Sequence, residues 1–121
     1  MKNQPSAHFI YFHNPRCSKS RNGLVFLESH GLFPTLKNVL NDGIDAEEVV
    51  ELVKALDMHP SECIRKNEPA FHQLESDEFS IEEWSDIIHR NPILLERPIL
   101  WDIKRNVAVI GRPPSNFLTL L

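Results

Sequence analysis

A strand, a helix and a second strand follow one another in the first 41 residues, and this order constrains the fold more than any other feature. "HFIYF" (8–12) is an aromatic and β-branched run that ends at an Asn-Pro turn, which indicates a buried strand. Apolar residues at helical spacing after Cys17 predict a helix that Gly31 is suited to end. "PTLKNVLN" (34–41) predicts a second strand. A helix between neighbouring strands implies a right-handed parallel βαβ unit.

The middle and the end of the chain carry different patterns. A capping-box pair, a polar residue followed three positions later by Glu, predicts helices over 45–56 and 80–91, and a further short helix is expected from Ser61. "RPILWDI" and "VAVIG" then predict an antiparallel hairpin, and "PPSNFLTLL" (113–121) a final helix. This order predicts an α/β fold: a small mixed sheet with a helical insertion between a βαβ unit and a C-terminal ββα unit.

Length and composition limit the class of protein. A chain of 121 residues without a linker or repeat predicts a single domain over 1–121. The formal charge of -4 argues against a nucleic-acid partner but leaves room for a local cationic pocket. No apolar run approaches a signal peptide or a membrane span, so we expect a cytoplasmic protein without a membrane partner. The six histidines lack ligand spacing, so we expect no metal site.

The two cysteines match no disulfide framework or zinc pattern, which indicates reduced thiols in a cytosol. Cys17 stands at the expected start of a helix, where unpaired N–H groups and the helix dipole lower a thiol pKa. Nearby cations (Arg16, Lys19, Arg21 and, in its protonated form, His13) would lower it further, and the Ser18 and Ser20 hydroxyls could hydrogen-bond the sulfur. The sequence therefore predicts a reactive thiolate. The alternative is a structural cysteine at a strand–helix junction.

Cys17 and Ser20 form a C-x-x-S motif, with a hydroxyl where a dithiol redox protein carries its second sulfur. An oxidised Cys17 would therefore need an outside thiol, most simply glutathione. Cys63 is the other internal candidate for a resolving thiol. Its place on a short helix beside Ile64 favours a buried, inert cysteine instead.

Three arginines near prolines are candidates for binding an oxyanion: Arg65, Arg97 and Arg112. The guanidinium group makes paired hydrogen bonds to oxyanions and keeps its proton. A lone Arg-Pro is more often a surface turn, so the sequence leaves both interpretations open for each residue.

Taken together, "IYFHNPRCSKSR", "IRKNEP", "NPILLERPIL" and "IGRPP", in this order and spacing, resemble the ArsC family of glutaredoxin-coupled arsenate reductases. The similarity runs from about Phe9 to the C-terminus and is greatest with the short bacterial branch that carries the HNPRCSKSR loop. The resemblance implies a thioredoxin-like fold, cis geometry at Pro98 and a role in arsenic detoxification.

The resemblance also implies a role for each site residue. Cys17 matches the nucleophile that attacks arsenate and then forms a mixed disulfide with glutathione, which glutaredoxin resolves. Arg65, Arg97 and Arg112 match the arginines that bind the oxyanion. His13 matches the histidine near the thiolate, and Ser20 matches the residue whose hydroxyl hydrogen-bonds the thiolate. Glutathione is then a co-substrate, and no bound cofactor is expected.

Two other functions stay open. The chain could be a glutathione-dependent thiol–disulfide oxidoreductase with another substrate. It could also be a redox-responsive regulator without turnover, like the Spx-type regulators of similar fold. Those regulators carry C-x-x-C, so Ser20 counts against that branch, and three anion-binding arginines would have no evident purpose there.

Overall fold

The computed structural model describes residues 6–76 and 78–121, which form two compact units. The sheet unit consists of the described part of Met1–Asn38 together with Arg97–Leu121. The helical unit is Val39–Glu96 and is inserted between the two halves of the sheet unit in the sequence. The expected helical insertion is therefore confirmed, whereas the expectation of one domain over 1–121 stays a prediction.

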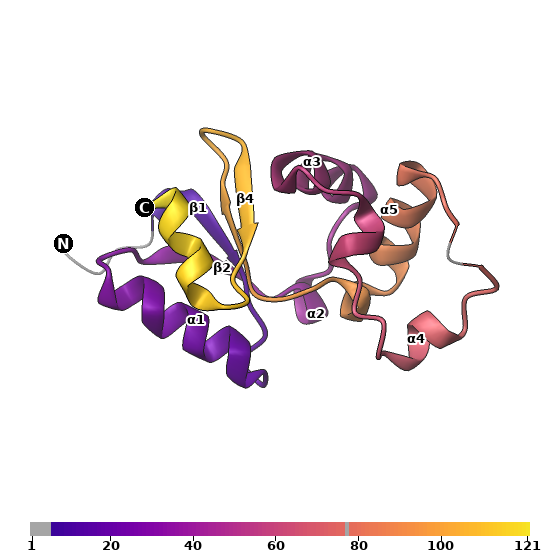
Figure 1. Cartoon of the computed structure of the whole chain (residues 1–121), viewed down its shortest axis with the longest axis horizontal. Helices are drawn as coiled ribbons and strands as arrows, with labels where there is room; N and C mark the ends of the chain where they lie inside the picture. The colour runs from indigo at the N-terminus through magenta and orange to yellow at the C-terminus, as the bar shows by residue number, and fades with distance from the viewer. Residues whose placement is uncertain (1–5, 77) are drawn as a thin grey trace. The chain divides into compact units, whose positions relative to one another are not determined.

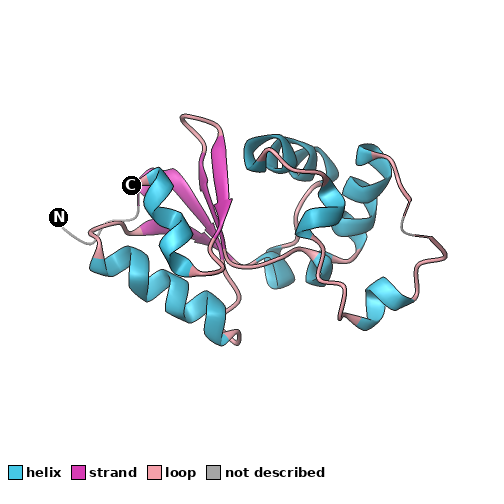
Figure 2. Ribbon diagram, viewed as in Figure 1, coloured by secondary structure: helices cyan, strands magenta, loops and turns pink. Residues whose placement is uncertain are grey.

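The described residues form a four-stranded mixed sheet in the order β2-β1-β3-β4 (Figure 2). Its strands are β1 (Ser6–Phe12), β2 (Pro34–Lys37), β3 (Ile99–Asp102) and β4 (Val107–Ile110). β1 pairs with β2 in parallel, and the β1–β3 and β3–β4 pairs are antiparallel. The parallel βαβ unit and the antiparallel hairpin expected from the sequence are both confirmed.

Helix α1 (Ser18–Ser29) and the 3-10 helix η3 (Pro114–Leu120) pack on the sheet unit and contact each other (Figure 1, indigo and yellow). One core cluster contains buried side chains from the strands and from both helices. Its members are Tyr11, Leu27, Leu100, Phe117 and Leu120. At Gly23, a β-carbon would lie 3.1 Å from Pro98 Cγ and would overlap the Tyr11 hydroxyl. Glycine at this position therefore lets α1 lie close to the start of β3.

The helical unit contains short and long helical segments. They are α2 (Val39–Asp42), α3 (Ala46–Leu56), η1 (Pro60–Cys63), α4 (Pro69–His72), α5 (Ile81–Arg90) and η2 (Pro92–Leu94). The amphipathic helices α3 and α5 pack against each other (Figure 1). Both predicted capping boxes are present, at Asp45 and at Ser80, and α5 ends before Pro92 as expected.

Two predicted elements are corrected. The second strand ends at Lys37 and does not reach Asn41, because Val39–Asp42 forms a helical turn closed by Gly43 at φ +73°. The helix expected from Ser61 is one 3-10 turn, Pro60–Cys63. Extended backbone follows it, because Ile64 forms an antiparallel bridge with Leu95.

Two further differences concern helices. The structure contains a short helix at Pro69–His72, with a proline in its first turn, which was not predicted from the sequence. The final helix exists but is of the 3-10 type.

The Arg97–Pro98 peptide bond is cis, as the resemblance implied, and Arg112–Pro113 is cis as well. None of the helices formed by residues 6–76 and 78–121 is long and apolar enough to cross a membrane.

Candidate active site

Cys17 is the N-cap residue of α1, at the end of the loop that leaves β1. Its backbone is extended (φ -93°, ψ 122°), its N–H donates to Asn14 O at 2.9 Å, and its carbonyl accepts the Arg21 N–H at 3.0 Å. The side chain is partly exposed, and the first turn of α1 contains no acidic residue. The predicted position at the positive end of the helix dipole is confirmed, and this position favours a thiolate.

Ser20 is fully buried and holds the loop together through its hydroxyl. Its Oγ lies 2.8 Å from His13 Nδ1 and accepts the Asn14 N–H at 2.9 Å. Its carbonyl oxygen accepts the Tyr11 hydroxyl at 2.6 Å. The structure therefore brings His13, in the loop before Cys17, together with Ser20, in the first turn of α1, and their roles toward the sulfur stay predictions.

His13 is buried, and burial lowers its pKa below the ordinary value of 6.5, with a further contribution from the Arg21 cation. The ring is therefore held in its neutral form near neutral pH. In one tautomer Nδ1 accepts the Ser20 hydroxyl proton. In the other, Nδ1–H donates to Ser20, and the serine proton can turn toward another acceptor such as a thiolate.

Arg97 and Arg112 are brought together by the sheet unit. Arg97 is buried directly before β3, Arg112 follows β4, and Arg112 Nε donates to the Arg97 carbonyl oxygen at 2.6 Å. The Gly111 N–H donates to the Pro98 carbonyl oxygen at 2.9 Å, which joins the same two segments a second time. A β-carbon at Gly23 of α1 would lie 3.1 Å from Pro98 Cγ, so α1 lies close to the segment that carries Arg97 and Pro98.

A cavity of about 340 Å³ connects α1 with the Arg112 segment. It is lined by Lys19, Asn22, Gly111, Arg112, Pro113 and Pro114. The cavity is therefore bordered by the first turn of α1, which begins next to Cys17. It is also bordered by Arg112, one of the predicted anion-binding residues. Lys19 was identified from the sequence as a nearby cation, whereas Asn22 carries no signal that distinguishes it from an exposed helix residue.

Arg65 lies in the helical unit and is surrounded by carboxylates. Its Nε is 3.2 Å from Glu68 Oε1, and its Nη1 is 3.5 Å from Glu96 Oε1. Its backbone N–H donates to the Leu94 carbonyl oxygen at 2.7 Å. These contacts hold Arg65 within its own unit, and its convergence on Cys17 stays a prediction.

Cys63 is buried in the helical unit, with 1% of its surface exposed. Burial raises the pKa of its thiol to about 12, with smaller contributions to the same rise from the nearby Glu62 and Glu96 charges. A thiol with this pKa is protonated at neutral pH and is a poor nucleophile. Burial and the pKa both support the interpretation of Cys63 as an inert core residue.

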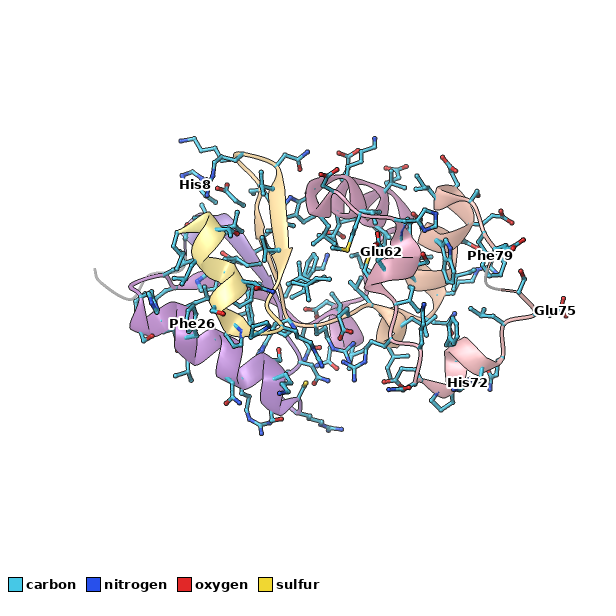
Figure 3. The ribbon with its side chains drawn as sticks, viewed as in Figure 1. His8, Phe26, Glu62, His72, Glu75 and Phe79 are labelled. Atoms are coloured by element: carbon cyan, nitrogen blue, oxygen red, sulfur yellow. The ribbon has the colours of Figure 1, made fainter. Side chains whose placement is uncertain are left out.

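The charges are divided unequally between the two units. The sheet unit's sequence contains nine of the 13 Lys and Arg residues and only two of the 17 Asp and Glu residues, Glu28 and Asp102. The helical unit carries the remaining acidic side chains, of which Glu62 and Glu75 are labelled in Figure 3. The positive charge that an anion site needs is thus concentrated in the unit that contains Cys17.

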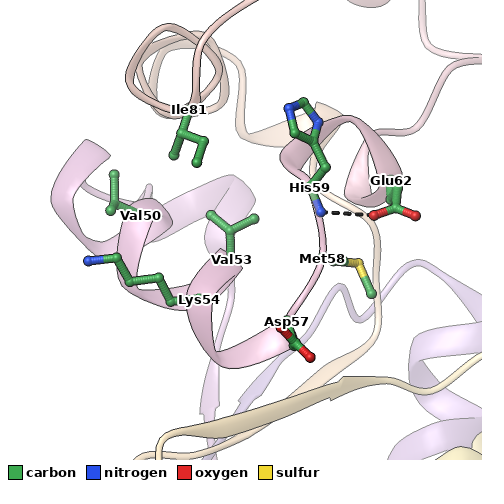
Figure 4. Close-up of a pocket in the computed structure, with 8 residues that line it drawn as sticks. All are labelled: Val50, Val53, Lys54, Asp57, Met58, His59, Glu62 and Ile81. Atoms are coloured by element: carbon green, nitrogen blue, oxygen red, sulfur yellow. Dashed lines mark hydrogen bonds between the residues drawn. The ribbon is translucent and has the colours of Figure 1, made fainter.

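A second cavity, of about 530 Å³, lies in the helical unit and contains none of the predicted site residues (Figure 4). Val50, Val53 and Ile81 form its apolar part, and His59 stands at its edge, with its backbone N–H donating to Glu62 at 2.8 Å. Among residues 6–76 and 78–121, His, Cys, Asp and Glu side chains do not gather into a group that could hold a metal ion.

Comparisons with known proteins agree with this arrangement. The sequence model of the ArsC family matches residues 12–120. The chain is 36% identical over 113 residues to "Uncharacterized protein YfgD" of Escherichia coli K12, with 91% of this chain and 93% of that protein covered. It is 32% identical over 115 residues to an arsenate reductase of Haemophilus influenzae, with 93% of this chain and 97% of that protein covered.

A solved structure, the arsenate reductase from Vibrio cholerae, has a TM-score of 0.87 to this chain at 30% sequence identity, with 93% and 97% of the two chains covered. The mixed sheet, the helical insertion and the cis peptide bond before Pro98 fit the thioredoxin-like fold that the resemblance implied. The match extends over both units and over nearly the whole sequence. The chain therefore belongs to the ArsC family.

Proposed function

We propose that this chain is an oxidoreductase that reduces arsenate to arsenite through Cys17, with glutathione as co-substrate and glutaredoxin as the protein that regenerates the thiol. The observation that carries the proposal is the position of Cys17 at the N-cap of α1, in the basic unit that also holds Arg97 and Arg112. Similarity to arsenate reductases over more than nine-tenths of the chain supports the choice of substrate.

In the first step, the Cys17 thiolate attacks arsenic(V), a sulfur–arsenic bond forms, and one arsenate oxygen leaves as water after protonation. The oxidation state of arsenic does not change. Arg97, Arg112 and Arg65 are proposed to hold the arsenate oxygens, since fixed guanidinium groups stabilise the charge that develops there. His13 and Ser20 are proposed to keep the loop in place and to support the thiolate by hydrogen bonding.

In the second step, the glutathione sulfur attacks the Cys17 sulfur, a disulfide forms, and the sulfur–arsenic bond breaks. Its electron pair stays on arsenic, which becomes arsenic(III) and leaves as arsenite with the proton that glutathione gives up. In the third step, a glutaredoxin thiolate takes the glutathione moiety and releases Cys17. All electrons come from thiols, so this scheme needs no resident cofactor, and it suits a cytoplasm whose thiols are kept reduced.

The test is arsenate-dependent NADPH consumption with glutathione, glutathione reductase and glutaredoxin. The intact chain should be active, Cys17→Ser should be inactive, and Cys63→Ser should keep its activity because that thiol is buried and protonated. Retained arsenate reduction by Cys17→Ser would exclude the proposed nucleophile. Activity of the intact chain on a glutathionylated protein, without activity on arsenate, would instead favour a thiol–disulfide oxidoreductase.

A further inference from the structure

The cavity of about 340 Å³ beside α1 has a lining that a small oxyanion alone does not explain. Lys19 and Arg112 supply two cations, Asn22 supplies an amide, and Pro113 and Pro114 supply apolar surface. This volume lies in the range of pockets that bind small organic molecules, which combine apolar walls with a few polar groups. The lining therefore suits an organic anion with hydrogen-bonding groups.

The position of the cavity relative to the nucleophile limits which organic anion fits. Lys19 and Asn22 are two and five residues after Cys17, so their backbones lie about 3 and 8 Å further along the helix axis. An extended tripeptide spans about 10 Å. In glutathione the thiol belongs to the middle residue, so a terminal carboxylate lies about two residue lengths, roughly 7 Å, from the sulfur, which is enough to reach the side chains of both residues.

Lys19 and Asn22 are also arranged to act together. They are three residues apart on α1, so their side chains are neighbours on the helix surface. Both are exposed, and Arg112 is exposed across the cavity from them. A carboxylate in this space can accept from the Lys19 ammonium and the Asn22 amide, while Arg112, at the border of the same space, is the residue proposed to hold the arsenate oxygens.

We propose that this cavity binds a carboxylate of the thiol co-substrate, and that Lys19 and Asn22 select a peptide thiol such as glutathione over thiols without a carboxylate. This inference rests on the proposed function, since it names the site of the reductant in that reaction. It gives α1 a second use: the N-cap residue of the helix supplies the nucleophile, and the first two turns hold the reductant.

The kinetic test compares Lys19→Ala, Asn22→Ala and Lys19→Arg with the control Lys104→Ala, which removes a lysine from the β3–β4 turn of the same unit. Lys19→Ala should raise the KM for glutathione about fivefold, as expected for the loss of one exposed ionic contact, with little change in the KM for arsenate. Asn22→Ala should raise the KM for glutathione about two- to threefold. Lys19→Arg and Lys104→Ala should stay close to the intact chain.

A binding measurement separates this inference from the reaction. S-methylglutathione cannot react, so its affinity for the Cys17→Ser chain, followed by nuclear magnetic resonance titration, reports binding alone. Adding Lys19→Ala should weaken this affinity about fivefold, and S-methylglutathione esterified on its glycine carboxylate should bind correspondingly more weakly.

The outcomes are distinguishable. If the intact chain reduces arsenate with glutathione and Lys19→Ala leaves the KM for glutathione unchanged, the inference is overturned and the proposed function stands. A rise in the KM for arsenate alone would overturn it too, because the cavity would then serve the oxyanion. If the intact chain does not reduce arsenate, the proposed function fails, and binding of S-methylglutathione with the expected Lys19 dependence still supports the cavity assignment.

Discussion

Arg112 Nε donates a hydrogen bond to the backbone carbonyl oxygen of Arg97, 2.6 Å away. This contact uses one of the five N–H donors of the guanidinium group and ties its orientation to the segment before β3. Arg97 and Arg112 are two of the three predicted anion-binding residues. They are 15 positions apart in the sequence, and the sheet unit makes them neighbours.

Arg112→Lys is expected to weaken arsenate reduction while the charge is retained. Lysine cannot make the fork-shaped contact with an oxyanion, and it loses the Nε–H that contacts Arg97. A hydrogen bond to a charged group contributes about 1.5 to 3 kcal/mol, so kcat/KM for arsenate should fall about 10- to 100-fold. Arg90→Lys, an exposed arginine of the helical unit, is the matched control. Equal kcat/KM for arsenate in both variants would show that Arg112 does not bind the oxyanion.

Ser20→Ala is expected to destabilise the loop that carries Cys17. The change leaves the Asn14 N–H and His13 Nδ1 without the buried hydroxyl that each contacts. A buried polar group left without a partner costs about 1 to 3 kcal/mol. Urea denaturation should show this loss in the free energy of unfolding. Ser29→Ala removes an exposed hydroxyl from the last residue of α1 and should change stability by less than about 0.5 kcal/mol.

The two cysteines are expected to differ in alkylation. Cys17 is partly exposed at the helix N-terminus, whereas Cys63 is buried and its pKa is raised to about 12. Iodoacetamide at pH 7 should therefore add one carbamidomethyl group to the folded chain, on Cys17, because the thiolate is the reacting species. Peptide mass spectrometry identifies the modified residue. Modification of Cys63 at a comparable rate would contradict the buried, protonated state.

The fold was predictable where local signals are strong. Both capping boxes mark helix starts correctly, because a polar side chain and a Glu three residues later satisfy backbone donors at a helix N-terminus. The strand expected to reach Asn41 stops at Lys37, because a helical turn closed by Gly43 competes for the same residues. The Asp-Gly pair in this segment was the available signal for a turn.

The segment after Cys63 was less predictable, because its conformation depends on a distant part of the chain. Ile64 is extended and bridges to Leu95, and the Glu96 N–H donates to the Cys63 carbonyl oxygen at 2.8 Å. These contacts join residues about thirty positions apart, so tertiary pairing decides against the local helical pattern. Local spacing does not contain this information.

The candidate site was partly predictable for a similar reason. The position of Cys17 at a helix start follows from local sequence, and the structure agrees. The contact between Ser20 and His13 spans seven residues and requires the turn between β1 and α1. The role of Tyr11, whose hydroxyl contacts the Ser20 carbonyl oxygen, was not predicted, because a strand tyrosine usually indicates only a core position.

The stability of the chain should depend on pH through His13. Its pKa is lower in the folded chain than in the unfolded chain, because burial and the Arg21 cation disfavour the imidazolium. Below pH 6.5 the unfolded state therefore binds a proton that the folded state does not. The contribution of His13 to the free energy of unfolding is complete above pH 6.5 and is lost as pH falls toward the folded pKa.

Urea denaturation between pH 5 and pH 8 measures this dependence. The intact chain should lose stability below pH 6.5, and His13→Gln, which has no titrating ring, should show a flatter curve over the same interval. The difference between the two curves isolates the histidine from the other groups that titrate in this range. Parallel curves would mean that the His13 ring takes up a proton equally well in the folded and unfolded chains, in conflict with its burial beside Ser20 and Arg21.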